Sequence, residues 1–129
     1  MSKMWKVLVV DDEADCRNFA KSVLESKLPA QVIIGKNGEE GLRLARKEQP
    51  DLIVLDVMMP VKDGYDTFLE LHEDPQTSAI PVIMLSTLTE VRVHMEGRPI
   101  QEQPAHFVEK PVEPVVLLRV ARTVLGINK

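Results

Sequence analysis

The sequence predicts a doubly wound α/β domain, in which buried parallel strands alternate with helices on both faces of one sheet. Short runs of Val, Ile and Leu recur along the chain, as expected for strands that are covered on both faces. Between these runs, apolar residues recur at intervals of three and four, which is the period of an amphipathic helix. With 129 residues, the chain is long enough to form one hydrophobic core and is expected to be one domain.

Each of the five expected strands is one of these apolar runs, and turn residues or prolines separate it from the next helix. The strands cover residues 6–10, 32–34, 52–55, 80–85 and 105–108. The helices are expected from Cys16 to before Pro29, from Asn37 or Gly38 to before Pro50, from Gly64 to before Pro75, over 89–96, and over 113–125. Right-handed crossovers leave few topologies for such a sheet, of which the flavodoxin-like strand order 2-1-3-4-5 is expected.

Two of the helices carry specific expectations. In the first, the predicted inward stripe consists of Cys16, Phe19, Ala20, Val23, Leu24 and Leu28. The fourth helix is expected to be short, because Gly97, Pro99 and Pro104 leave room for little more than two turns. An irregular loop is expected to lead from it to the fifth strand.

Composition restricts the possible partners and the cellular compartment. The formal net charge is −4 without any basic run, which argues against direct binding of nucleic acid by this chain. Cys16 is the only cysteine, so no internal disulfide is possible, and a reducing compartment is expected. No stretch approaches the roughly 20 apolar residues of a membrane span. We therefore expect a soluble cytoplasmic protein that does not contact a membrane.

Polar side chains stand at the ends of four of the predicted strands. Asp11 and Asp12 follow the first strand, Asp56 the third, Ser86 the fourth and Lys110 the fifth. Because parallel strands end at one edge of a sheet, we expect these groups to meet there. Three crowded carboxylates need a cation, and hard oxygen ligands suit Mg²⁺. With a lysine and a hydroxyl added, the set favours phosphoryl chemistry, in which a carboxylate can itself accept the phosphoryl group.

Four segments together carry a family resemblance: VLVVDDE, DLIVLDVMMPVKDG, VIMLST and FVEKP, each at a strand end and in this order. With them, the chain resembles the receiver domain of two-component response regulators, of the chemotaxis-type single-domain kind. The resemblance extends over essentially the whole chain. It implies that residues 1–129 form one receiver domain without an output domain. It also implies a signalling protein and not an enzyme, one that catalyses only its own phosphorylation and dephosphorylation.

The resemblance also implies a role for each matching residue of the site. Asp56 would accept a phosphoryl group from phosphohistidine on a sensor histidine kinase or phosphotransfer protein. Asp12 would bind Mg²⁺ directly and Asp11 through a water, with Asp56 and the main-chain carbonyl of Met58 as further ligands. Lys110 would pair with Asp56 and later with the phosphoryl oxygens, and its peptide bond to Pro111 would be cis.

A second group of residues would respond to phosphorylation. The resemblance assigns Ser86 as the hydroxyl switch and Phe107 as the aromatic switch, which together change the surface of the fourth helix, fifth strand and fifth helix for an unknown output protein. A dimer through this surface is possible in the family, but the prolines after the fourth helix argue against its usual form. Thr87 is bulky enough to narrow access to Asp56. Met58 and Leu88 are poor at orienting water, which predicts a long-lived phosphoryl group.

Other interpretations of the same residues remain open. Phe107 is equally well explained as a fixed core aromatic, and Asp11 or Asp12 also suits the N-cap of the first helix. A pseudo-receiver that binds its partner without phosphorylation is a competing function, although all five key residues are retained. A phosphatase-type hydrolase would carry Asp-x-Asp after the first strand, and a flavin carrier would carry a phosphate loop there, whereas DDEAD fits neither.

Overall fold

The computed structural model describes residues 3–59, 62–99 and 103–127, without the side chains of residues 94 and 95. Strands and helices alternate along the chain. In order they are β1 (Trp5–Val10), α1 (Ala14–Lys27), β2 (Ala30–Gly35), α2 (Gly38–Glu48), β3 (Leu52–Asp56), α3 (Gly64–Glu73), β4 (Val82–Ser86), α4 (Leu88–Met95), β5 (His106–Glu109) and α5 (Pro114–Leu125). No helix in these ranges is both long and apolar enough to cross a lipid bilayer.

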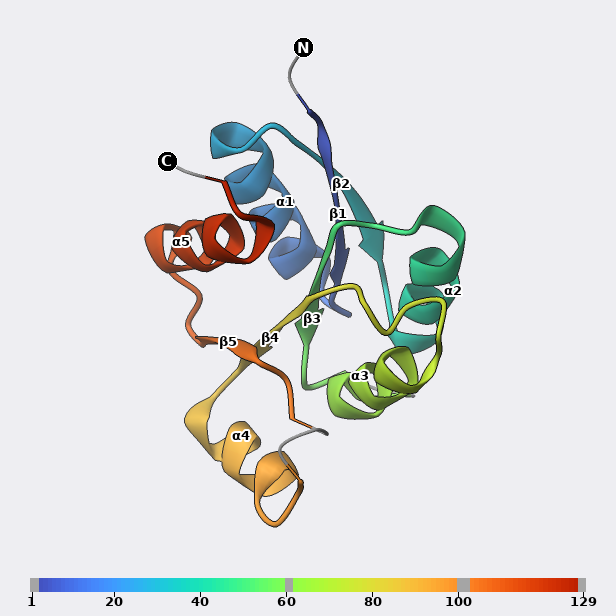
Figure 1. The fold of residues 1–129 in the computed structure, drawn as a ribbon. Helices are drawn as coiled ribbons and strands as arrows, with labels where there is room; N and C mark the ends of the chain where they lie inside the picture. Colours follow the sequence, from blue (N-terminus) through green and yellow to red (C-terminus); the bar gives the residue numbers. More distant parts are fainter. Residues whose placement is uncertain (1–2, 60–61, 100–102, 128–129) are drawn as a thin grey trace.

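The five strands form one parallel sheet in the order β2-β1-β3-β4-β5, which confirms the predicted topology. Figure 1 shows α1 beside α5 on one face of the sheet and α2 beside α3 on the other. Successive residues of a strand point to opposite faces, so each strand contributes to both cores. Val7 and Val9 of β1 belong to the core under α1 and α5, whereas Leu8 and Val10 belong to the core under α2 and α3.

Most predicted strand boundaries are shifted by one or two residues. β4 begins two residues later than predicted, at Val82 instead of residue 80. The N–H of Ile80 donates to the carbonyl of Thr77 (3.0 Å), and Pro81 has no N–H to give to the sheet. β2 is longer than predicted because it pairs with β1 along its whole length, from Trp5 opposite Ala30 onward.

The inward stripe of α1 was predicted wrongly at its N-terminal end. Ala20 and Leu24 are buried as expected, but Cys16 is exposed and Phe19 is 41% exposed. The N-cap of α1 is Glu13, so neither Asp11 nor Asp12 is the cap residue. Cys16 and Phe19 lie outside the core because the first turns of α1 line a cavity at the end of the sheet instead of packing on it.

The short fourth helix is confirmed, with bounds that differ by one residue from the prediction. Its N-terminus is a capping box, in which the Thr87 hydroxyl accepts from the N–H of Glu90 and the Glu90 carboxylate accepts from the N–H of Thr87 (3.1 and 2.9 Å). Just beyond its C-terminal end, Gly97 has a φ of +79°. Figure 1 shows α4 standing apart from the other helices, and of its described side chains only Val91 packs, partly buried, on a core.

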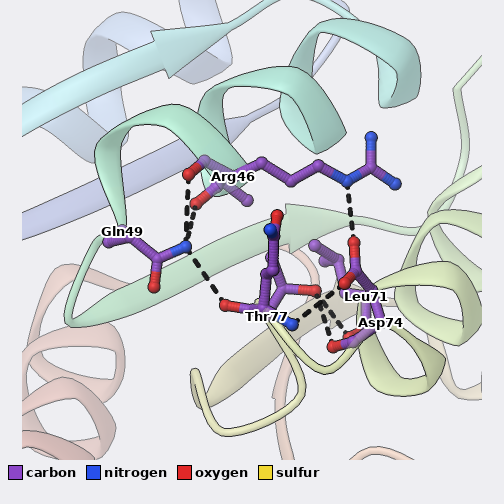
Figure 2. A network of polar contacts seen from close by, with 7 residues as sticks. Arg46, Gln49, Leu71, Asp74 and Thr77 are labelled. Carbon is purple, nitrogen blue, oxygen red and sulfur yellow. Dashed lines mark hydrogen bonds and ion pairs between the residues drawn. The ribbon is translucent and has the colours of Figure 1, made fainter.

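α2, in contrast, is tied to the connection between α3 and β4 by a polar network (Figure 2). The Arg46 guanidinium forms an ion pair with Asp74, with Nε 2.8 Å from Oδ2. The side-chain amide of Gln49 donates to the carbonyl of Gln76 (3.1 Å) as well as to two carbonyls of α2. The buried hydroxyl of Thr77 donates to a carbonyl of α3 (2.7 Å). These bonds fix the C-terminal end of α2.

Candidate functional site

The predicted polar residues meet at one edge of the sheet. Asp56 is the last residue of β3 and Ser86 the last of β4, while Asp11 and Lys110 directly follow β1 and β5. The ammonium group of Lys110 forms an ion pair with Oδ1 of Asp56. The main-chain N–H of Lys110 donates to the carbonyl of Ser86 (3.0 Å), which joins the ends of β4 and β5. The peptide bond between Lys110 and Pro111 is cis, as expected.

Three carboxylates gather beside this ion pair. One oxygen from each of Asp11, Asp12 and Asp56 lies within 4.8 Å of the other two. Asp11 and Asp56 are each only 4% exposed, whereas Asp12 is exposed to solvent. A set of two deep carboxylates and one at the surface fits Mg²⁺, which prefers hard oxygen ligands and keeps several waters.

Burial makes the two deep carboxylates harder to ionise. Loss of water raises the pKa of Asp56 to about 6, and the charges of Asp11 and Asp12 add to this while Lys110 opposes it. The pKa of Asp11 is also raised, chiefly by burial and further by the charge of Asp12, against a main-chain hydrogen bond that lowers it. For Lys110, burial lowers the pKa, but pairing with Asp56 outweighs it and the net shift is upward. These shifts indicate surplus negative charge that a cation would neutralise.

The two predicted switch residues lie in different environments. Ser86 is 2% exposed, and its buried hydroxyl has no hydrogen-bond partner among the described residues. A buried hydroxyl without a partner is unusual in a folded protein, and it leaves Ser86 with an unused donor beside the acid cluster. Phe107 is partly buried against the core under α2 and α3, which agrees with both interpretations of this residue. Met58 is 54% exposed, and because its thioether is a soft ligand that does not suit Mg²⁺, only its main-chain carbonyl is a candidate ligand.

A cavity of about 520 Å³ opens beside the acid cluster. Asp11, Asp56 and Lys110 lie on its polar side, and Phe19 and Val112 are among its apolar lining residues. Thr87, which was expected to narrow access to Asp56, is not among the lining residues. From its helical spacing, Phe19 was expected in the core. Its position on the helix that follows the DDE segment was the one available indication that it lies near the site.

Two side chains of α1 form hydrogen bonds with the segment from Asp11 to Glu13, which were not predicted. The Cys16 thiol, which also lines the cavity, donates to Glu13 (Sγ to Oε1, 3.4 Å). Nη1 of Arg17 donates to the main-chain carbonyl of Asp11 (2.9 Å). A bond from a side chain to a main-chain carbonyl has no sequence signature, so only the structure reveals it.

Comparison with known proteins agrees with this geometry. The model of the response regulator receiver domain family matches residues 7–122. Protein PilH of Pseudomonas aeruginosa is 34% identical over 123 residues, which cover 95% of this chain and 99% of PilH. "Probable transcriptional regulator ycf27" of Porphyra purpurea is 44% identical over 123 residues, 93% of this chain. The chain spans only 47% of that regulator, or about half its length.

A solved structure shares the fold. It is the receiver domain of the sensor histidine kinase PA1611 from Pseudomonas aeruginosa PAO1, with a magnesium ion coordinated in its active-site cleft. Its TM-score is 0.84 at 24% identity, and the match covers 96% of this chain and 99% of that chain. On the family match, the PilH identity and the strand order, the chain belongs to the response regulator receiver family, the signalling modules of two-component systems.

Proposed function

We propose that this receiver accepts a phosphoryl group on Asp56 in the presence of Mg²⁺ and passes the signal on through a changed surface. The observation that carries this proposal is the pairing of a 4% exposed Asp56 with Lys110 beside two further carboxylates. A buried carboxylate that adjoins both a cation and a metal-binding acid cluster is suited to accept a phosphoryl group.

Each residue of the site would have its own role in the phosphoryl transfer. Asp11, Asp12, Asp56 and the main-chain carbonyl of Met58 would hold Mg²⁺, directly or through water. When bound, the metal supplies positive charge that offsets the repulsion between the carboxylates and the incoming phosphoryl oxygens. A carboxylate oxygen of Asp56 attacks phosphorus, the bond from phosphorus to the donor nitrogen of phosphohistidine breaks, and the imidazole retains that electron pair. The ammonium group of Lys110 then pairs with a phosphoryl oxygen.

The switch follows from the chain connection at the end of β4. Ser86 has a free hydroxyl, and the next residue, Thr87, caps α4. When the Ser86 hydroxyl donates to the phosphoryl group, its main chain and the start of α4 move with it. A phosphoryl group that binds this arrangement better shifts the population toward it. Phe107 either turns inward as Ser86 moves or stays a fixed core residue.

The partners follow from the same chemistry. A sensor histidine kinase or a phosphotransfer protein would supply the phosphoryl group, and an output protein would recognise the surface around α4. We expect the phosphoryl group to be long-lived, because Met58 and Leu88 are apolar and 54% and 56% exposed, and neither can orient an attacking water. Loss of the group within seconds would contradict this expectation.

Intact mass spectrometry after incubation with acetyl phosphate tests the proposal. Wild type should gain one phosphoryl group only when Mg²⁺ is present, and Asp56→Asn should gain none. Asp15→Asn is the matched control, because Asp15 is an exposed carboxylate that lines the same cavity. It should be phosphorylated like wild type. Addition to Asp56→Asn would contradict the assignment of the acceptor. No addition to wild type or to Thr87→Ala would favour a binding module that works without phosphorylation.

A further inference from the structure

Arg17 reaches back from the first turn of α1 to the loop that carries the acid cluster. Its Nη1 donates to the main-chain carbonyl of Asp11 (2.9 Å). The same residue is held at two other points: the N–H of Asp11 donates to Gly35 (3.2 Å), and its Oδ1 accepts from the N–H of Glu13 (3.0 Å). Main chain and carboxylate of Asp11 are thereby both restrained, and Arg17 supplies the only one of these bonds that comes from another side chain.

Apart from the bond of Nη1, the Arg17 guanidinium makes few polar contacts with the described residues. Its Nε is buried without a hydrogen-bond partner, and Arg17 forms no ion pair with an acidic side chain in the described part of the chain. An unpaired buried N–H is unfavourable.

We propose that Arg17 is a positioning residue of the magnesium site, an inference that rests on the proposed function. By holding the carbonyl of Asp11, it keeps the turn from Asp11 to Glu13 in the shape that directs the carboxylates of Asp11 and Asp12 toward Asp56. In this role Arg17 would not be a metal ligand itself, because its guanidinium has no lone pair to offer a cation. Residues that orient metal ligands in this way contribute strongly to metal affinity.

Charge and geometry predict opposite effects at this position, which makes the inference testable. The guanidinium is a positive charge near the site of a divalent cation, so its removal would tighten Mg²⁺ binding if the charge dominated. If Arg17 acts by holding Asp11, its removal weakens binding. Arg17→Met keeps most of the aliphatic stem but loses both charge and donor, whereas Arg17→Lys keeps both and has no Nε–H to leave unpaired.

The experiment measures the dissociation constant for Mg²⁺ by NMR titration of backbone amides in the unphosphorylated full chain. Arg17→Met should bind Mg²⁺ about tenfold more weakly than wild type. Arg17→Lys should restore the affinity to within roughly threefold. Arg43→Met is the matched control, because Arg43 is exposed on α2 and, among the residues that the structure describes, forms an ion pair with Glu40 alone; it should bind like wild type.

Melting temperatures in EDTA separate positioning from a merely structural role, which would lower the melting temperature of Arg17→Met without changing its Mg²⁺ affinity. Equal or tighter binding by folded Arg17→Met overturns the inference and leaves the proposed function intact. Absence of Mg²⁺ binding by wild type overturns both.

If Arg17→Met does not fold, the NMR signals of the Arg17 guanidinium in the wild-type protein test the inference instead. Its Nη–H signals should exchange with water more slowly than those of Arg43 and shift on addition of Mg²⁺. Signals that behave like those of Arg43 would overturn the inference.

Discussion

α2 and α4 begin in the same way but are held in very different ways. Each follows the end of a strand, and each starts with a side-chain cap: Asn37 accepts from the N–H of Glu40, and Thr87 accepts from the N–H of Glu90. Local sequence therefore specifies the start of both helices equally well. What differs is the contact that each helix makes with the rest of the molecule.

α2 is packed along its whole length. Leu42 and Ala45 are buried in the core. Gly41 lies so close to β1 that an added Cβ would approach a methyl group of Val10 to 2.9 Å. At its N-terminal end Glu39 pairs with Lys62 (3.7 Å), and at its C-terminal end lies the network of Figure 2.

α4 lacks such contacts. None of its described side chains is buried, and Leu88 and Val93 are 56% and 72% exposed. Its capping box holds the helix together without attaching it to the sheet. The comparison teaches that capping decides where a helix begins, whereas packing decides where it stays. The loose attachment of α4 is consistent with the proposal that a change at Ser86 displaces this helix.

Truncating one apolar side chain in each helix should give the largest difference. Leu42→Ala, at a residue that is 3% exposed, should lower the free energy of unfolding by about 2–4 kcal/mol, because it leaves a cavity. Val93→Ala should change it by less than about 0.5 kcal/mol. Urea unfolding followed by circular dichroism measures both. Similar losses in the two variants would show that α4 is packed more tightly than the structure indicates.

Removal of the N-caps should have effects of intermediate size that differ in kind. Asn37→Ala should lower the global free energy of unfolding by about 1 kcal/mol, because α2 unfolds with the core. Thr87→Ala should leave global stability nearly unchanged and speed amide hydrogen exchange within α4. Urea unfolding measures the global stability of both variants, and hydrogen exchange measures the local stability of α4. A loss of global unfolding free energy in Thr87→Ala as large as that in Asn37→Ala would contradict the loose attachment of α4.

A cation–π contact joins the segment after α4 to α3, and its removal should have a smaller effect. The Arg98 guanidinium carbon lies 4.6 Å from the ring centroid of Tyr65. Such a contact contributes roughly 0.5–1 kcal/mol at an exposed site. Arg98→Gln should therefore speed hydrogen exchange in α4 about two- to fivefold. Arg92→Gln, an exposed change on α4 itself, is the control; equal effects of the two variants would argue against this contact as a restraint.

The smallest expected effect concerns the ion pair of Figure 2. The hydrogen bond from Arg46 holds the pKa of Asp74 below its usual 3.8. A carboxyl whose pKa is lowered in the folded state stabilises the protein fully at pH values above its ordinary pKa of 3.8. That contribution is lost as the pH falls through the pKa of the folded state. Asp74→Asn should thus be slightly less stable than wild type at pH 7 and equal to it in strong acid. Thermal unfolding across this pH range measures the difference in stability between the two proteins. A difference that does not change with pH would show that it does not come from the ion pair.

The sequence predicted the parallel sheet and the meeting of five polar residues at its edge because both follow from general rules. Continuous apolar runs mark strands that are covered on both faces, and parallel strands end at one edge. Asp11, Asp56 and Lys110 directly follow or end such runs, so their positions could be inferred before any contact was known. The motif order then specified the family.

The errors share a physical cause, which is that periodicity describes one helix and not its surroundings. The spacing of Cys16 and Phe19 matches that of Ala20, but the sequence does not show that the sheet ends beneath them. For the same reason it predicted the existence of α4 and not its lack of packing. The bond of Arg17 to the Asp11 carbonyl was also beyond prediction, because it depends on a main-chain atom.

The position of Cys16 has a practical consequence. It is the only cysteine of the chain, is exposed, and lines the cavity beside Asp56. Partial loss of water around its sulfur, the hydrogen bond to Glu13 and the nearby carboxylates raise its pKa to about 11. Little thiolate is present at neutral pH, so the protein should resist air oxidation and react slowly with maleimides. Under alkaline conditions the same thiol offers one attachment point for a fluorophore or spin label, beside Asp56 and without any substitution.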